Sequence, residues 1–340
     1  MPHEVEQMLY VGATPWHELG TKLDAPPTAA EAIVAAGLDW EVGLRDLRTS
    51  PDLENGYAGG EAVSHRATFR KSDGRILGVV GPGYHPIQNG TAFDWFNPFL
   101  ETGMAAIETA GSLRHGQRVW ILAKLNRAPS VIVPGDEVQK YVLLANSHDG
   151  TLASRVGFTP VRVVCANTLS MAVDDAASKL IRVRHTKNAK DVLEKVRDIM
   201  NLADASFEAT ADQYRALARA QVHPGDLEKY VRMVFTAPKT EQEKAKAALS
   251  PTASMLAEVL DDADKKNGRV FEKVSELFET GNGNQLPGVR GTYWAAYNAV
   301  TEYTTHFRGK DKESRLNALF ADAAVINRKA LRSALELVQA

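Results

Sequence analysis

Residues 106–125, AIETAGSLRHGQRVWILAKL, carry the pattern that decides the fold class. Two strand-like apolar runs flank the polar tripeptide 114–116 (Arg-His-Gly), which is typical of the turn of a β-hairpin. Similar runs at 138–145 and 160–164 follow after loops that are too short for crossover helices. Because parallel strands need such crossovers, the sequence predicts an antiparallel β-meander over residues 106–164.

Helical patterns lie on both sides of this meander. Upstream, Thr28 is a predicted N-cap of a short helix that stops at Gly37, and Asn89 of a second helix that stops at Gly103. Beyond His185, apolar residues recur with a helical spacing of about 3.6 residues as far as the C-terminus. The sequence therefore predicts an α+β fold: an antiparallel β-meander core with flanking helices, followed by an all-helical C-terminal region.

These changes of pattern divide the chain into three expected parts. Residues 1–26 have too little apolar length for a core of their own and are predicted to form an N-terminal arm. Residues 27–188 are predicted to form a strand-rich core domain, and residues 189–340 a helical C-terminal domain.

Composition is that of a folded globular protein, with 44% hydrophobic and 24% charged residues. No apolar run approaches the ~20 residues that a membrane-spanning helix requires. The acidic start MPHEVEQMLYVG lacks the charged and apolar regions of a signal peptide. The single cysteine, Cys165, excludes an internal disulfide and fits a reducing compartment. We therefore expect a cytoplasmic protein that has no membrane partner.

Charge is balanced overall, with a net charge of −2, but its distribution along the chain is uneven. Two windows, 110–135 and 176–190, contain lysine and arginine and no acidic residue. Folding can join them into one positive groove, or leave them as separate solvated faces. The candidate nucleic-acid-binding residues, from these windows and the strands between them, are Arg114, Arg118, Lys124, Arg127, Arg155, Arg162, Arg182, Arg184 and Lys187.

The motifs of several common enzyme classes are missing. The chain has no phosphate-binding loop, no dinucleotide fingerprint and no nucleophile elbow. Its nine histidines form no H-x-x-x-H or H-E-x-x-H pair, so a zinc site has little support, and Cys165 is interpreted as a core residue. The sequence therefore predicts no catalytic residue, no metal and no cofactor, and it favours a binding protein over an enzyme.

Two further groups form a candidate polar site. His148 and Asp149 lie between predicted strands, where they form either a turn or a general base or phosphate contact. Asn298, Glu302 and His306 recur at i, i+4 and i+8 on one helix face. That row is either a partner-binding surface or a hydrogen-bonded seam between helices.

Four separated stretches resemble one known family: TPWHELGT (14–21), LLANSHDGT (143–151), TPVRVVCANTL (159–169) and GTYWAAYNAVTEYTTH (291–306). They look like the phage- and plasmid-borne family known as domain of unknown function nine-three-two, also called phage/plasmid-like proteins. The resemblance runs over essentially the whole chain and implies that the protein belongs to a mobile element.

The order of elements is also similar, more distantly, to the core of single-strand annealing recombinases such as RecT, Erf and Redβ. The resemblance implies that subunits form rings or filaments, in which a basic groove holds one strand by its backbone. The meander would be residues 106–164, and a helix would begin at Asn167. The residue motifs of that group do not align with this chain, so this likeness rests on topology alone.

The expected function is that of a nucleic-acid-binding protein of a mobile element, which binds or anneals single-stranded DNA in recombination as a homo-oligomer. Trp120 and Tyr141 offer stacking surfaces, unless they are core residues. One alternative is a protein-binding module that acts on a host system through the helical half. Another is a metal-dependent nuclease, for which the carboxylates of Glu108, Asp136 and Asp149 would have to converge.

Overall fold

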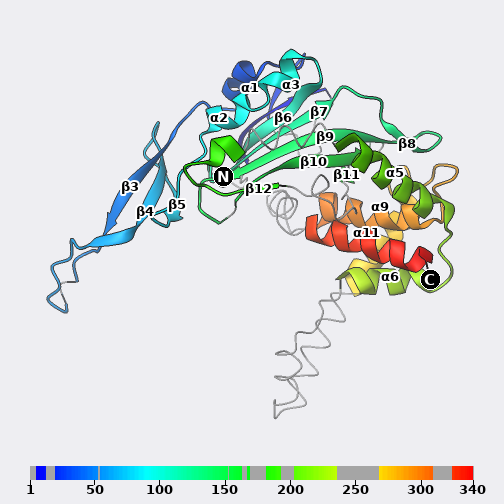
Figure 1. Cartoon of the computed structure of the whole chain (residues 1–340). Coiled ribbons are helices and arrows are strands. Elements are labelled where there is room, and N and C mark those ends of the chain that lie inside the picture. Colours follow the sequence, from blue (N-terminus) through cyan, green and yellow to red (C-terminus); the bar gives the residue numbers. More distant parts are fainter. Residues whose placement is uncertain are drawn as a thin grey trace, which may run out of the picture. The chain divides into compact units, whose positions relative to one another are not determined.

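The chain is described by a computed structural model (Figure 1). The described residues are 5–12, 20–52, 54–151, 153–162, 167–168, 181–192, 203–235, 268–308 and 324–339. They fall into two compact units. Unit 1 comprises Met1–Ala128, Gln139–Thr159 and Val173–Phe207, and unit 2 comprises Pro129–Val138, Pro160–Ala172 and Glu208–Ala340.

The main sheet has the strand order β11-β10-β9-β7-β6-β1-β2, with β12 paired to β10 and β8 to β9. The pairs β1–β6, β6–β7, β7–β9, β8–β9, β10–β11 and β10–β12 are antiparallel, which confirms the α+β prediction and its meander. The strands are β1 (Val5–Val11), β2 (Thr21–Leu23), β6 (Ala105–Leu113), β7 (Arg118–Leu125), β8 (Ser130–Val133), β9 (Asp136–Ser147), β10 (Ser154–Arg162), β11 (Asn167–Thr168) and β12 (Ile181–Val183).

The N-terminal segment is not an arm, because β1 lies inside the main sheet between β6 and β2. Its residues conceal this role in the sequence. Met8 and Leu9 are neighbours and both are buried, so the strand lacks the alternation of a half-exposed strand. The register with β6 also shifts between Val5 and Met8.

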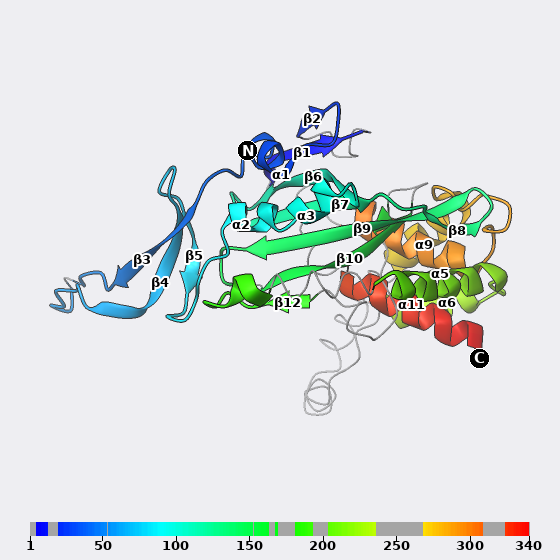
Figure 2. The same cartoon turned by 45° about the horizontal axis from the view of Figure 1, so that its top comes forward.

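Three short helices of unit 1 lie against one face of the sheet, where α1 and α3 contact β6 (Figure 2). The helix α1 (Ala29–Ala35) begins with the predicted capping box. The second predicted helix is two helices, α2 (Asn89–Asp94) and α3 (Asn97–Glu101), and Pro98 lies in the first turn of α3. Asn89 does not cap α2, because its side chain instead donates to Leu38 O (3.0 Å).

A second, three-stranded sheet of unit 1 consists of β3 (Val42–Arg48), β4 (Ala62–Arg70) and β5 (Ile76–Val80). It packs against the β9–β10 turn. A Cβ atom added at Gly78 would lie 2.5 Å from Asp149 Cα, and Thr68 Oγ1 donates to His148 O (2.7 Å). This contact requires glycine at position 78.

Unit 2 is mainly helical and its core is aromatic, with Tyr214, Tyr230, Trp294 and Tyr297 fully buried. The indole Nε1 of Trp294 donates to the buried carboxylate of Asp136 (2.8 Å). Its helices are the C-terminal part of α5 (Ala203–Arg219), then α6 (Asp226–Phe235), a helix over 268–280, α9 (Tyr293–Glu302), the π-helical turn η1 (Tyr303–Phe307) and α11 (Ala324–Gln339).

Two further expectations differ from the structure. The predicted boundary at residue 188 does not separate the units, because β9, β10 and α5 each contribute residues to both units. The helix expected from Asn167 does not begin there, since Asn167 and Thr168 pair with β10 as β11. Residues 169–180 lie outside the described residues, as do Cys165 and Trp16. Among the helices that the structure describes, none has the length and apolar character to span a membrane.

Candidate functional site

Strands β7, β9, β10 and β12 lie side by side in the main sheet (Figure 2). The register sets Arg118 of β7 opposite Ser147 of β9, and Arg155 of β10 opposite Arg182 of β12. Neighbouring strands lie about 4.8 Å apart, and β12 is the third strand from β7. The backbones of β7 and β12 are therefore roughly 14 Å apart. The strand order thus brings the first basic window close to the second.

Alternation along the strands decides which face each arginine occupies. The side chains of Ser154 and Asn146 share one face, because Ser154 Oγ donates to Asn146 Oδ1 (2.5 Å). Their neighbours Arg155 and Ser147 therefore lie on the opposite face. On β12 and just beyond it, Val183 and His185 are buried. Register and alternation place Arg118, Arg155 and Arg184 on one face, here called the arginine face, and Arg182 is the backbone register partner of Arg155.

The arginine face is drawn from β7, β10 and the segment after β12. Arg155 of β10 and Arg182 of β12 are partners in the backbone register. Asp149 is close to Arg118. Burial by itself would raise the pKa of Asp149, but hydrogen bonds from Ser147 and Thr151, with the charge of Arg118, keep that pKa below its usual value. Asp149 is therefore an ionised carboxylate bound within its own turn.

The other predicted cations lie elsewhere. Arg114 is in the left-handed turn before β7, with φ of 53°. Lys124 is near the far end of β7 and pairs with Glu108 (3.8 Å), and Arg127 is exposed just beyond that end. Lys187 is exposed in the segment after β12. Arg162, opposite Asn167, belongs to unit 2.

The two aromatic residues considered for base stacking are occupied by the protein itself. Trp120 is 6% exposed, and its ring covers Gly111, where an added Cβ would lie 2.6 Å from Trp120 Cη2. Tyr141 donates its hydroxyl hydrogen to Glu108 Oε2 (2.7 Å). Burial and the neighbouring carboxylate raise the pKa of Tyr141, so its phenol stays protonated.

His148 is fully buried, at 0% exposure. Its Nε2 donates to Asn89 Oδ1 (2.9 Å), and its ring meets Trp40 edge to face. Burial lowers the pKa of His148 to about 3, and the nearby His185 adds to this shift. A neutral imidazole without access to solvent holds the β9–β10 turn in place and does not present a base to a substrate.

His148 belongs to a buried polar cluster that the sequence did not reveal. Its second histidine, His185, lies 3.3 Å from Ser154 Oγ and stacks on Tyr84 with ring centroids 4.6 Å apart. Burial lowers the pKa of His185 to about 4. Because His185 follows Arg184 directly, these contacts fix the end of β12 against β10 and so position the arginine face.

The polar row on α9 and η1 belongs to unit 2. Asn298 is fully buried and its Nδ2 donates to Trp294 O (2.8 Å). Glu302 is 5% exposed and accepts from the backbone N–H of Asn282 (3.1 Å). His306 is half-buried within η1. Asn298 thus bonds within its own helix, and Glu302 bonds that helix to the loop at 281–284. These contacts are those of a hydrogen-bonded seam.

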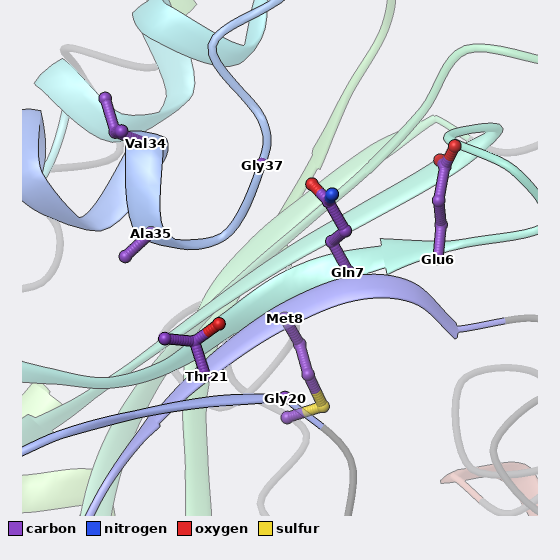
Figure 3. Close-up of a pocket in the computed structure, with 8 residues that line it drawn as sticks. All are labelled: Glu6, Gln7, Met8, Gly20, Thr21, Val34, Ala35 and Gly37. Carbon is purple, nitrogen blue, oxygen red and sulfur yellow. The ribbon is translucent and has the colours of Figure 1, made fainter.

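No metal centre is found within the described ranges, where no group of three or more His, Cys, Asp or Glu side chains is placed to hold an ion. A pocket of about 300 Å³ lies between β1 and α1 (Figure 3). The carboxylate of Glu6 at its rim is already bound by Arg70 (2.6 and 2.9 Å), and Gln7 packs against Gly37. This pocket therefore offers a ligand little charge to bind.

Comparison with known proteins places the chain in a family. No curated protein and no solved structure matches it. One family model matches residues 76–328, a range that includes three of the four stretches on which the resemblance rests, 143–151, 159–169 and 291–306, and leaves out the stretch at 14–21. The chain belongs to the family described as Domain of unknown function (DUF932).

Proposed function

We propose that this protein binds single-stranded nucleic acid through the arginine face and acts as a DNA-binding or annealing protein of a mobile element. The observation that supports the proposal most is the placement of Arg155 opposite Arg182, with Arg118 and Arg184 on the same face. Arginine side chains hold phosphate groups by charge-assisted hydrogen bonds, and the release of counterions supplies affinity.

The surroundings of the arginine face favour contact with phosphates over contact with bases. The aromatic side chains considered on this face, Trp120 and Tyr141, are engaged by the protein. Base stacking, which sequence-tolerant binders often use, is therefore not provided by them. A nucleic-acid strand that is held by its phosphate backbone keeps its bases available for pairing, and annealing requires such pairing.

Assembly into a homo-oligomer in the cytoplasm is part of the proposal. One surface of unit 1 is suited to a contact between copies. Ile76 and Val79 are 51% and 56% exposed, and their register partners on β4 are Phe69 and Ala67. These partners share one face of the small sheet. Ala67 is 3% exposed and the Arg45 guanidinium covers the Phe69 ring (3.8 Å), so Ile76 and Val79 are the exposed members of this group. Exposed apolar side chains that lie together can form a contact surface. Ile76→Gln with Val79→Gln, which keeps the net charge, should lower the mass measured by light scattering and leave the affinity for oligonucleotide unchanged.

The nucleic-acid proposal is tested by fluorescence anisotropy with a labelled 30-nucleotide strand at 50 mM salt. The parent is expected to bind with a Kd on the order of 10⁻⁶ M or lower. Arg155→Glu with Arg182→Glu should weaken binding on the order of 50-fold, because two phosphate contacts are lost at about 0.7 counterions each.

The matched control is Lys229→Glu with Arg232→Glu, which makes the same change of net charge at two exposed positions of α6. It should bind like the parent, and circular dichroism should show both double variants folded. An arginine-face variant that binds as tightly as the control, or a parent that does not bind at micromolar concentration, contradicts the proposal.

A further inference from the structure

A second polar group lies on the face that carries Arg118. Lys124 is six residues beyond Arg118 on β7, so the two residues share a face. At about 3.3 Å per residue, roughly 20 Å of strand separates them. The register places Tyr141 of β9 directly opposite Lys124. The ammonium and the phenol hydroxyl are therefore neighbours on this face.

Glu108 reaches this pair from β6 because of a β-bulge. The pairing of β6 with β7 shifts between Ile107 and Thr109, so Glu108 is the extra residue and has no partner in register. Bulges often redirect a side chain that has a function. Here the carboxylate reaches past β7 to β9, where Glu108 Oε2 accepts from the Tyr141 hydroxyl (2.7 Å).

The same carboxylate also faces the lysine, with Glu108 Oε1 at 3.8 Å from Lys124 Nζ. An ammonium and a hydroxyl are donors that commonly hold a phosphate oxygen of nucleic acid. The side chains of Lys124 and Glu108 are 41% and 32% exposed, so solvent and ligand can reach them. The carboxylate thus occupies the place of an anion between two donors at an accessible position.

We propose that Glu108 is a built-in competitor, which occupies a phosphate subsite formed by Lys124 and Tyr141 and so limits the length of nucleic acid held on this face. The inference rests on the proposed function, because it assigns a regulator to the same binding face. Removal of the carboxylate makes both donors available to a phosphate and removes a negative charge that repels the strand.

The test is a gain of binding in Glu108→Ala, measured by anisotropy over a series of salt concentrations. One added phosphate contact should tighten binding about fivefold at 0.1 M salt and steepen the slope of log K against log salt by about 0.7. Glu108→Gln keeps the shape of the side chain but loses its charge, and it should give a smaller gain.

A double-mutant cycle identifies the donor. Lys124→Ala should change binding little in the parent, where Glu108 already engages the ammonium, and should abolish the gain in the Glu108→Ala background. The control is Glu41→Ala, because Glu41 forms a similar surface pair with Lys71 (2.6 Å) on the small sheet. Glu41→Ala alters the net charge equally and should leave the salt slope unchanged.

The possible outcomes separate the two ideas. Suppose that the parent binds the oligonucleotide and that Glu108→Ala neither tightens binding nor steepens the salt slope. The competitor role is then wrong, and the proposal for the arginine face still stands. The competitor role is also wrong if Lys124→Ala weakens binding equally in both backgrounds. If neither the parent nor Glu108→Ala binds strand, the proposed function itself fails.

Discussion

Acidification from pH 8 to pH 5 is expected to destabilise unit 1 by about 4 kcal/mol through His148 and His185. Burial lowers their pKa values from an ordinary 6.5 to about 3 and about 4 in the folded protein. Between these values and 6.5 the unfolded chain binds protons that the folded unit excludes. The stability contributed by the neutral imidazoles is therefore complete above pH 6.5 and is lost as the pH falls toward the folded pKa values.

The magnitude follows from the unfolded state. At pH 5 a histidine with a pKa of 6.5 lies 1.5 pH units below that value, which corresponds to about 2 kcal/mol for each group. The result depends little on the folded pKa values, since both folded groups remain mostly neutral at pH 5. Asp149 stays ionised there in both states, because its folded pKa is below the ordinary value of 3.8.

The assay is urea unfolding at pH 8 and pH 5, followed by tryptophan fluorescence, to which Trp40, Trp95 and Trp120 of unit 1 contribute. His185→Asn removes one of the two titrating groups. The free energy of unfolding of this variant should therefore fall about 2 kcal/mol less between pH 8 and pH 5 than that of the parent. His65→Asn, at an exposed position, should behave like the parent. A pH dependence that is equal in parent and His185→Asn would refute the reasoning.

Three further substitutions test the packing. Arg70→Ala leaves Glu6 without its bidentate partner and should cost about 3 kcal/mol of unfolding free energy in a urea titration, and Arg70→Lys should recover only part of this loss. Gly78→Ala brings a Cβ within 2.5 Å of the backbone of Asp149 and should lower stability by about 2 kcal/mol, and an unchanged urea midpoint would contradict this contact. Trp294→Phe removes the indole N–H donor to a buried carboxylate and should cost about 2 kcal/mol, with hydrogen exchange locating the loss in unit 2.

Local signals predicted the meander but not the whole sheet. The turn at 114–116 and its flanking strands were readable because hairpin pairing is local. The strand β1 was missed because its partner β6 is about a hundred residues away and its buried residues Met8 and Leu9 are adjacent. The unit boundary was misplaced because β9 and β10 each begin in one unit and end in the other.

The candidate site was partly predictable for the same reason. The acid-free windows include Arg118, Arg182 and Arg184, but their proximity in the sheet follows from the pairing of β7 with β9 and of β10 with β12, which no local pattern encodes. Glu108 lies two residues before the first window, and the bulge that turns it toward Lys124 is a property of the pairing alone. The network around His148 likewise joins residues dozens of positions apart.

Hydrogen exchange, measured by mass spectrometry with and without a saturating 30-nucleotide strand, tests the location of the binding face most directly. We expect slower exchange in peptides that cover 154–162 and 181–187, and unchanged exchange in α6 at 226–235. Protection that appears in α6 and spares both strand peptides would contradict the assignment of nucleic-acid binding to Arg118, Arg155, Arg182 and Arg184.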